Sequence, residues 1–145
     1  MAKTPLHYVD LRAFCYATED EKRVEEALRR FLPEESPIDR VETEGHYGDR
    51  ILVLSSRVET ADEIRHVLGQ LAELEDFERL LGELDDRVTE NTEFFVTLDK
   101  QAAFTDVVRL GDGITLRAKV EAYPATRDGA IENARELLSR LAEEH

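Results

Sequence analysis

Polar and apolar residues alternate near the start of the chain, from Leu6 to Ala17. Because successive side chains of a strand point to opposite faces, this alternation predicts a β-strand with one apolar face. The apolar face carries Val9, Leu11, Ala13, Cys15 and Ala17, and the other face carries Tyr8, Asp10, Arg12, Phe14 and Tyr16. A second long strand is predicted over residues 115–123, with Arg117, Lys119 and Tyr123 on its polar face.

Apolar residues at helical spacing predict several helices. Two helices follow capping boxes, in which a threonine and the glutamate three residues later satisfy free backbone N–H groups. These boxes begin at Thr18 and at Thr60. Another helix is expected near residues 74–84, and Thr126 is expected to cap the last one. Shorter strands are expected at residues 38–43, 50–58, 94–98 and 107–110.

This order of elements favours the α+β class. Strands that cluster between helices and are joined by tight turns predict a two-layer sandwich, in which a mostly antiparallel sheet has helices on one face. The chain shows no internal repeat, low-complexity segment or flexible linker, so we expect a single domain over residues 1–145.

The charge balance is strongly acidic. Asp and Glu number 33 against 19 Lys and Arg, which gives a formal net charge of -14. Lysine occurs only at Lys3, Lys22, Lys100 and Lys119. A partner with a positive surface would explain this balance. Adaptation to a very salty cytoplasm would also explain it, and we favour adaptation because the acidic residues are spread along the helices. At 1 M salt the Debye length is only about 3 Å, so such a surface does not exclude a nucleic-acid ligand.

The sequence offers little support for an enzyme. The four histidines are scattered, no glycine-rich phosphate loop is present, and Cys15 lies on an apolar strand face that favours a buried thiol. We therefore expect no catalytic residue, no metal site and no cofactor. No apolar run is long enough to span a bilayer, and the N-terminus lacks the apolar stretch of a secretory signal. We expect a cytoplasmic protein without membrane contact.

Three features suggest binding. The polar sheet face groups Arg12, Phe14 and Tyr16 with Arg117 and Lys119, which could stack bases and pair with phosphates. The alternative is a solvated or helix-covered face with ordinary cross-strand pairs.

Two turns are the other features. The segment GHYGDRI carries His46 between two glycines and Arg50 shortly after them, and the segment LDKQAA carries Lys100 and Gln101. We expect these four side chains to reach a phosphate or a 2′-hydroxyl group at the edges of the sheet. The alternatives are a hairpin whose glycines only supply positive φ, and an exposed turn in which Lys100 pairs with a carboxylate.

Three blocks in order, YATEDEKRVEEAL, GHYGDRI and LDKQAA, resemble an archaeal family of RNA-binding proteins described as predicted exosome subunits. The closing stretch YPATRDGAIENARELL also looks like the last helix of that family. The family is similar in fold to the large-subunit ribosomal protein that binds 5S rRNA. This resemblance implies RNA and exosome subunits as partners.

The family motifs are matched residue by residue at a few positions. Thr18 and Glu19 match the start of the family's first helix, and Gly45, His46 and Gly48 match its GHxG turn. The segment from Asp99 to Ala102 matches its DKQA block. The family usually has an arginine two residues before that aspartate, and here Thr97 takes its place.

A protein-interaction module is the rival interpretation. In that case a helix face or a sheet edge would bind a protein partner, or a homodimer would form through the sheet, without direct contact to RNA. Burial of the polar sheet face would favour this interpretation over RNA binding.

Overall fold

A computed structural model of the protein describes residues 6–45 and 47–144. It contains one five-stranded sheet in the order β2-β3-β1-β5-β4, and every neighbouring pair is antiparallel. The strands are β1 (Leu6–Tyr16), β2 (Asp39–Glu44), β3 (Arg50–Val58), β4 (Glu93–Asp99) and β5 (Gly113–Val120). The predicted α+β class with an antiparallel sheet is confirmed.

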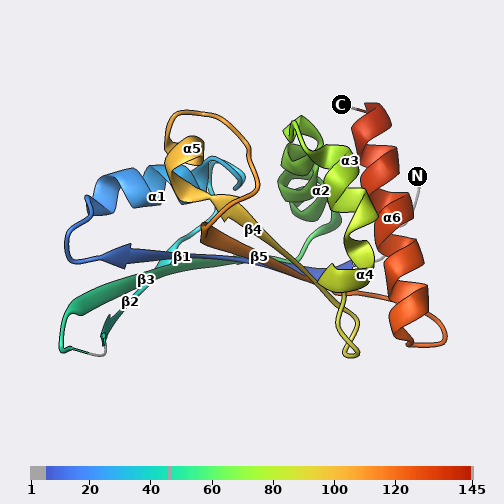
Figure 1. The fold of residues 1–145 in the computed structure, drawn as a ribbon, viewed down its shortest axis with the longest axis horizontal. Helices are drawn as coiled ribbons and strands as arrows, with labels where there is room; N and C mark the ends of the chain where they lie inside the picture. Colours follow the sequence, from blue (N-terminus) through green and yellow to red (C-terminus); the bar gives the residue numbers. More distant parts are fainter. Residues whose placement is uncertain (1–5, 46, 145) are drawn as a thin grey trace.

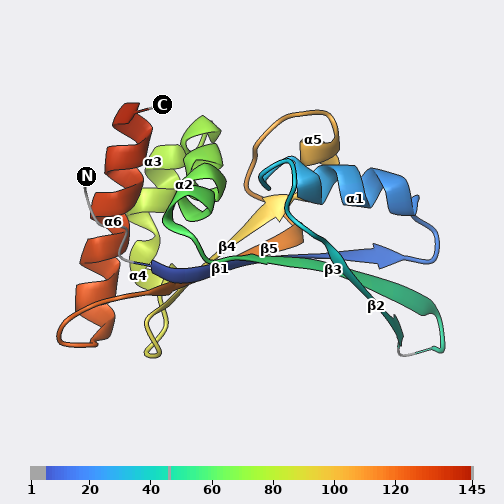
Figure 2. The same cartoon turned by 180° about the vertical axis from the view of Figure 1, so that it is seen from behind.

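The helices all lie on one side of this sheet (Figure 1). They are α1 (Glu21–Arg29), α2 (Ala61–Gly69), η1 (Gln70–Glu73), α3 (Phe77–Gly82), α4 (Leu84–Arg87), α5 (Lys100–Phe104) and α6 (Arg127–Glu144). One group, α1 and α5, covers one end of the sheet, and α2, α3, α4 and α6 cover the other end. Seen from behind as well, no helix of the described residues covers the opposite face of the sheet (Figure 2).

The core lies between the helices and the sheet. In β1 the residues Val9, Leu11, Ala13 and Cys15 are buried, while the residues between them are half-buried or exposed, as the alternation predicted. The fully buried side chains Leu54, Leu116 and Leu137 show that β3, β5 and α6 contribute to the same core. None of the helices in the described part of the chain is long and apolar enough to cross a membrane.

The first predicted helix start is wrong. Asp20, and not Thr18, caps α1, because its carboxylate accepts a hydrogen bond of 2.9 Å from the Lys22 amide. The three preceding residues form a turn, closed by a hydrogen bond of 2.9 Å from the Glu19 amide to the Tyr16 carbonyl. Thr60 does cap α2.

Three other boundaries also differ from the expectations. The apolar pattern over residues 74–84 does not form one helix but is divided between α3 and α4. Residues 107–110 form no strand, and only an isolated bridge joins Leu110 to Leu98. The last strand ends at Val120, so Tyr123 lies in the following loop, where it is 92% exposed.

Candidate functional site

The face of the sheet opposite the helices, here called the open face, is built from every second residue of the five strands. The registers place Arg12 beside Ser55 on one side and Thr115 on the other. The open face comprises Tyr8, Asp10, Arg12, Phe14, Tyr16, Asp39, Val41, Thr43, Ile51, Val53, Ser55, Arg57, Glu93, Phe95, Thr97, Thr115, Arg117 and Lys119. Four of the ten aromatic residues of the chain therefore lie on this face.

A shallow depression of about 310 Å³, here called the central hollow, lies in the middle of the open face. Its polar and aromatic lining consists of Asp10, Arg12, Phe14, Asp39, Ser55, Ser56, Arg57, Thr115 and Arg117. Three arginines thus face two aspartates, in a chain whose net charge is -14. The hollow is therefore a local exception to the acidic character of the protein, and it suits an anion better than the rest of the chain does.

Two side chains of the hollow are tightly paired with each other. Arg57 donates two hydrogen bonds to the carboxylate of Asp10, with lengths of 2.7 and 2.9 Å. Its guanidinium also lies 4.0 Å from the centre of the Tyr8 ring. The hydrogen bond with Asp10 raises the pKa of Arg57 above its ordinary value. Because of this bidentate pair, Arg57 has less capacity left for a ligand than an unpaired arginine has.

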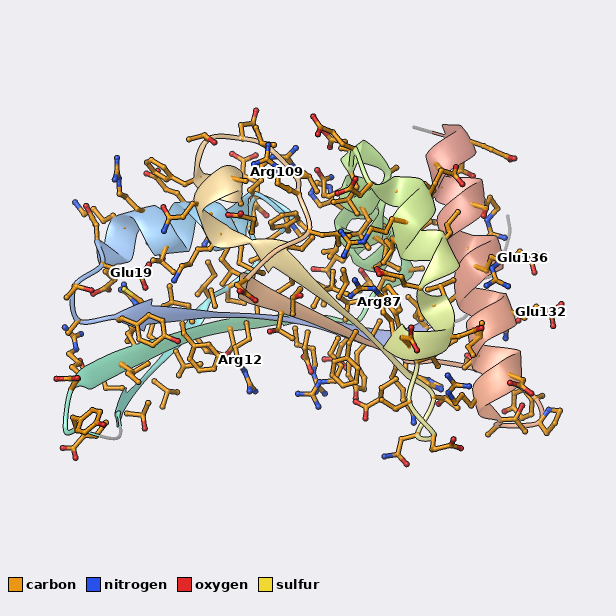
Figure 3. All side chains as sticks on the ribbon, in the orientation of Figure 1. Arg12, Glu19, Arg87, Arg109, Glu132 and Glu136 are labelled. Carbon is orange, nitrogen blue, oxygen red and sulfur yellow. The ribbon has the colours of Figure 1, made fainter. Side chains whose placement is uncertain are left out.

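Arg12 is the arginine of the hollow with the most capacity for a ligand. It is exposed, and it forms no hydrogen bond, ion pair or ring contact with the residues that the structure describes. Figure 3 shows that it projects from β1 on the side opposite the helices. Its cross-strand neighbours Ser55 and Thr115 are half-buried, and their hydroxyl groups also make no hydrogen bond within the described residues. A cation and two hydroxyl donors therefore converge without internal partners.

Arg117, on β5, lines the far side of the hollow, and Lys119 lies two residues further along the same strand, outside the hollow. Arg117 lies 3.5 Å from the Glu93 carboxylate and 5.6 Å from the centre of the Phe95 ring. Its buried Nε–H group has no hydrogen-bond partner among the described residues. The Nζ group of Lys119 donates to the Asn91 carbonyl. Arg117 is thus held loosely, whereas Lys119 is engaged with the backbone.

The open face is mostly apolar from Phe14, at the rim of the hollow, to the end of the face. In register, Phe14 lies beside Val53 and Val53 beside Val41, while Tyr16 lies beside Ile51. Val41 is 59% exposed and Tyr16 is 51% exposed, which is unusual for side chains of this size. We call these five residues the apolar row. Aromatic and aliphatic groups in this position form a surface on which a planar ring can stack.

Lys100 lies on the other side of the sheet, and it is not the surface residue that the sequence suggested. It is only 8% exposed. Its Nζ group donates hydrogen bonds of 2.8 Å to the Phe14 carbonyl and to the Glu19 carboxylate, and it lies 5.3 Å from the centre of the Tyr16 ring. Room for its side chain comes from Gly113, where an added Cβ would lie 2.5 Å from the Lys100 Cβ.

Glu19 completes this buried ion pair. Its carboxylate also accepts a hydrogen bond of 3.1 Å from the Tyr16 amide. Burial alone would raise the pKa of Glu19, but the hydrogen bonds from Lys100 and Tyr16 and the charge of Lys100 outweigh it, so the pKa is lowered. The neighbouring thiol of Cys15 is buried, and burial together with the charge of Glu19 raises its pKa. A raised pKa keeps the thiol protonated and unreactive.

Arg50 and Gln101, which the sequence also predicted, do not join the open face. Arg50 contacts the carboxylates of Glu42 and Glu21, at 2.7 and 3.9 Å, on the helix side. Gln101 is exposed on α5 and lines a second hollow of about 310 Å³ between α1 and α5. His46 lies outside the described residues. The open face thus brings together Arg12, Phe14, Tyr16, Arg117 and Lys119.

Sequence reasoning missed several residues of the hollow. Arg57 and Ser55 share one face of β3, and their alternation with Leu54 and Val58 could have revealed it. What the sequence did not supply was the pairing of β3 with β1, which places Arg57 beside Asp10. Within the described residues, no cluster of three or more His, Cys, Asp or Glu side chains could hold a metal ion.

Comparisons with known proteins agree on one family. A family model described as RNA binding matches residues 8–120. The chain is 35% identical to RNA-binding protein PAB1135 of Pyrococcus abyssi, over 94% of this chain and 96% of that protein. Among solved structures, protein AF2318 of Archaeoglobus fulgidus is 33% identical with a TM-score of 0.82, covering 91% of this chain and 99% of that one. Mth689 of Methanothermobacter thermautotrophicus is 40% identical with a TM-score of 0.78, covering 92% and 98%.

Proposed function

Because the chain belongs to the RNA-binding family matched over residues 8–120, we propose that it binds RNA and that the open face of its sheet is the contact surface. Binding is proposed without catalysis. A relative that carries the name RNA-binding protein, PAB1135, supports the class of ligand. The location of the site is supported by the side chains of this chain.

The observation that supports the open face as the RNA site is the difference between the two faces of the sheet. The helices of the described residues all lie on one face, so they leave the other face open to a partner (Figures 1 and 2). On this free face an unpaired Arg12 and two further arginines surround the central hollow, and the apolar row lies next to it. Guanidinium groups pair with phosphates, and aromatic rings stack with bases, so both halves of a nucleotide find a suitable surface.

A carboxylate placed in the hollow tests this location. We expect Ser55→Glu to weaken RNA binding at least tenfold, because the new charge would pair with Arg12 and repel phosphate. Fluorescence anisotropy with labelled RNA measures the affinity. Ser139→Glu is the matched control, since Ser139 is also half-buried but lies on α6, on the helix side. The control should bind RNA like the unmodified protein.

The outcomes separate the proposal from its rival. If no RNA binds at protein concentrations of about 100 µM, which covers the usual non-specific range, RNA binding is wrong. If Ser55→Glu binds RNA normally, the site lies elsewhere on the molecule. If the protein forms a dimer that Ser55→Glu dissociates while RNA binding stays unchanged, the open face is a protein interface instead.

We further propose a cytoplasmic protein that acts with the exosome in RNA processing or decay. The support is the resemblance of the blocks around Glu19, Gly48 and Lys100 to a family described as predicted exosome subunits. Affinity purification from the native host at its native salt, followed by identification of bound proteins and sequencing of bound RNA, tests this association. Absence of exosome subunits from the purified material would contradict it.

Adaptation to high salt is the last part of the proposal. It is supported by acidic side chains that project from the helices into solvent, as Glu132 and Glu136 do on α6 (Figure 3). Repulsion between such charges destabilises the fold at low ionic strength. We therefore expect the unfolding temperature to rise markedly between about 0.1 M and about 3 M KCl. An unfolding temperature that does not change with salt would contradict this adaptation.

A further inference from the structure

We infer that the open face takes unpaired RNA in a fixed arrangement, with a phosphate in the central hollow at Arg12 and the adjoining bases on Phe14 and Tyr16. This inference rests on the proposed function and names the form of RNA that the same surface selects. It also assigns separate roles to two neighbouring regions of the open face, the hollow and the apolar row.

The hollow is suited to a phosphate and not to a base. Arg12 has no partner within the described residues, and the hydroxyl groups of Ser55 and Thr115 flank it without partners of their own. Arg117 lines the far side, and its contact with Glu93 at 3.5 Å leaves it able to pair with an anion as well. Of the two aspartates in the lining, Asp10 does not oppose binding strongly, because its carboxylate is already neutralised by the two hydrogen bonds from Arg57. Asp39 is exposed, so solvent and salt screen its charge.

The apolar row is suited to bases and not to phosphates. It contains no charged side chain, and its aromatic members alternate along β1 with residues that point into the core. Phe14 borders the central hollow, two residues from Arg12 on the same face of the strand. Two residues of a strand span about 7 Å, so the positions of Arg12 and Phe14 are about as far apart as the phosphate and the base of one nucleotide. A second base would reach Tyr16, whose ring is 51% exposed.

Duplex RNA cannot use these two regions together. In an A-form helix the base faces are stacked on one another, and only the backbone and the groove edges are available to a protein. A sheet face that offers aromatic rings needs bases that are unstacked and splayed out, as in loops and single strands. Against a duplex the apolar row would make no stacking contact with a base, and the hollow would supply only a phosphate contact.

Affinity for two forms of one RNA tests the inference. The probes are a labelled single strand of about ten nucleotides and the blunt duplex that it forms with its complement, measured by fluorescence anisotropy over a range of KCl concentrations. We expect the full chain to bind the single strand at least tenfold more tightly than the duplex.

Two substitutions separate the base contact from the phosphate contact. Arg12→Gln should lower the slope of log affinity against log salt by about 0.7, because one phosphate contact on a single strand is lost. Phe14→Leu should weaken single-strand binding at least about fivefold and leave the slope of log affinity against log salt unchanged, because a stacking contact releases no counterions.

Tyr16→Leu should act like Phe14→Leu. Because Tyr16 is exposed, this substitution is less disruptive to folding. Arg135→Gln on α6, an exposed arginine away from the sheet, is the control and should change neither quantity.

Each failure has a distinct meaning. Equal or tighter binding of the duplex, or unchanged affinity in both aromatic variants, would overturn the inference while leaving RNA binding intact. An unchanged salt slope in Arg12→Gln would show that no phosphate binds at Arg12 in the hollow. If the unmodified protein binds neither form of RNA, the proposed function itself is wrong, and this inference with it.

Discussion

Two basic residues, Lys100 and Arg12, show opposite arrangements on the two faces of one sheet. Lys100 is 8% exposed and uses its ammonium group on the Phe14 carbonyl and the Glu19 carboxylate. Arg12 is exposed and has no partner among the described residues. Lys100 belongs to a block that carries the resemblance to a known family, whereas Arg12 belongs to none of the matching blocks.

This difference shows that a recognisable motif and a ligand contact need not coincide. The DKQA block joins the start of α5 to the turn between β1 and α1, and its lysine fixes the strand end that carries Phe14 and Tyr16. We regard Lys100 as a positioning residue, which holds the apolar row in place from the helix side of the sheet. Arg12 needs no motif, because the alternation of β1 is enough to direct it to the open face.

The strongest way to break the Lys100 arrangement is to fill the space above Gly113. In Gly113→Ala the new Cβ would lie 2.5 Å from the Lys100 Cβ, at a residue whose φ is +115. Because both the clash and the backbone strain are unfavourable, we expect the free energy of unfolding to fall by more than about 3 kcal/mol. Urea titration measures it.

Gly82→Ala is the matched control for this substitution. Nothing lies within 4 Å of a Cβ added at Gly82, and this glycine lies at the end of α3. We expect stability to stay unchanged or to rise by up to about 1 kcal/mol, because alanine favours helix. Equal losses in the two variants would show that the space beside Lys100 is unimportant.

Removal of the ammonium group should have the next largest effect. Lys100→Met keeps most of the side-chain volume but leaves the Glu19 carboxylate and the Phe14 carbonyl without their donor. We expect unfolding to become easier by about 2–4 kcal/mol, because one member of a mostly buried ion pair loses its partner. A double-mutant cycle with Glu19→Gln measures the coupling, and a coupling near zero would contradict a role for the pair.

The pH dependence of stability sharpens the same contrast. The pKa of Glu19 is lowered in the folded state, so this carboxylate contributes stability that is present above its ordinary pKa and is lost as the pH falls through the folded-state pKa. We therefore expect the difference in unfolding free energy between the unmodified protein and Glu19→Gln to be largest near neutral pH and to shrink in acid. A difference that stays constant with pH would show that the ionised carboxylate does not matter.

Loss of Arg12 should have the smallest effect on stability. Arg12→Gln removes an exposed side chain without described partners, so we expect the unfolding free energy to change by no more than about 0.5 kcal/mol. The expected loss of an RNA phosphate contact therefore would not be a consequence of misfolding. Thermal unfolding beside the RNA measurement checks this, and a loss above about 2 kcal/mol would instead reveal a structural role for Arg12.

The sequence predicted most of the fold, because its alternation is strict where one strand face is buried. The strand bounds of β1 and β3 and the cap of α2 at Thr60 are close to their predictions. The first cap was misplaced because Thr18 and Asp20 are both good caps, and local sequence alone does not decide between them. Leu80 and Leu84 are both fully buried, and their spacing of four residues would also suit one continuous helix, so the local pattern does not reveal the break between α3 and α4.

The site was less predictable, since it depends on which strands pair. Alternation identified Arg12, Phe14 and Arg117 as members of a polar face, and the register then placed Ser55 and Arg57 beside them. The burial of Lys100 was not predicted either. A lysine next to a turn is usually exposed, and here it is buried because a glycine 13 residues later in the chain leaves room for its side chain.

The central position of β1 has a consequence for how the protein is made. Val9 pairs with Val58 on one side and with Ala118 on the other, 49 and 109 positions later in the chain. During synthesis, 109 further residues must therefore follow Val9 before the second edge of β1 is paired. An unpaired edge of this kind is a site of aggregation, and pairing over such long separations slows folding. The nascent chain thus depends on the late arrival of β5 to close its sheet.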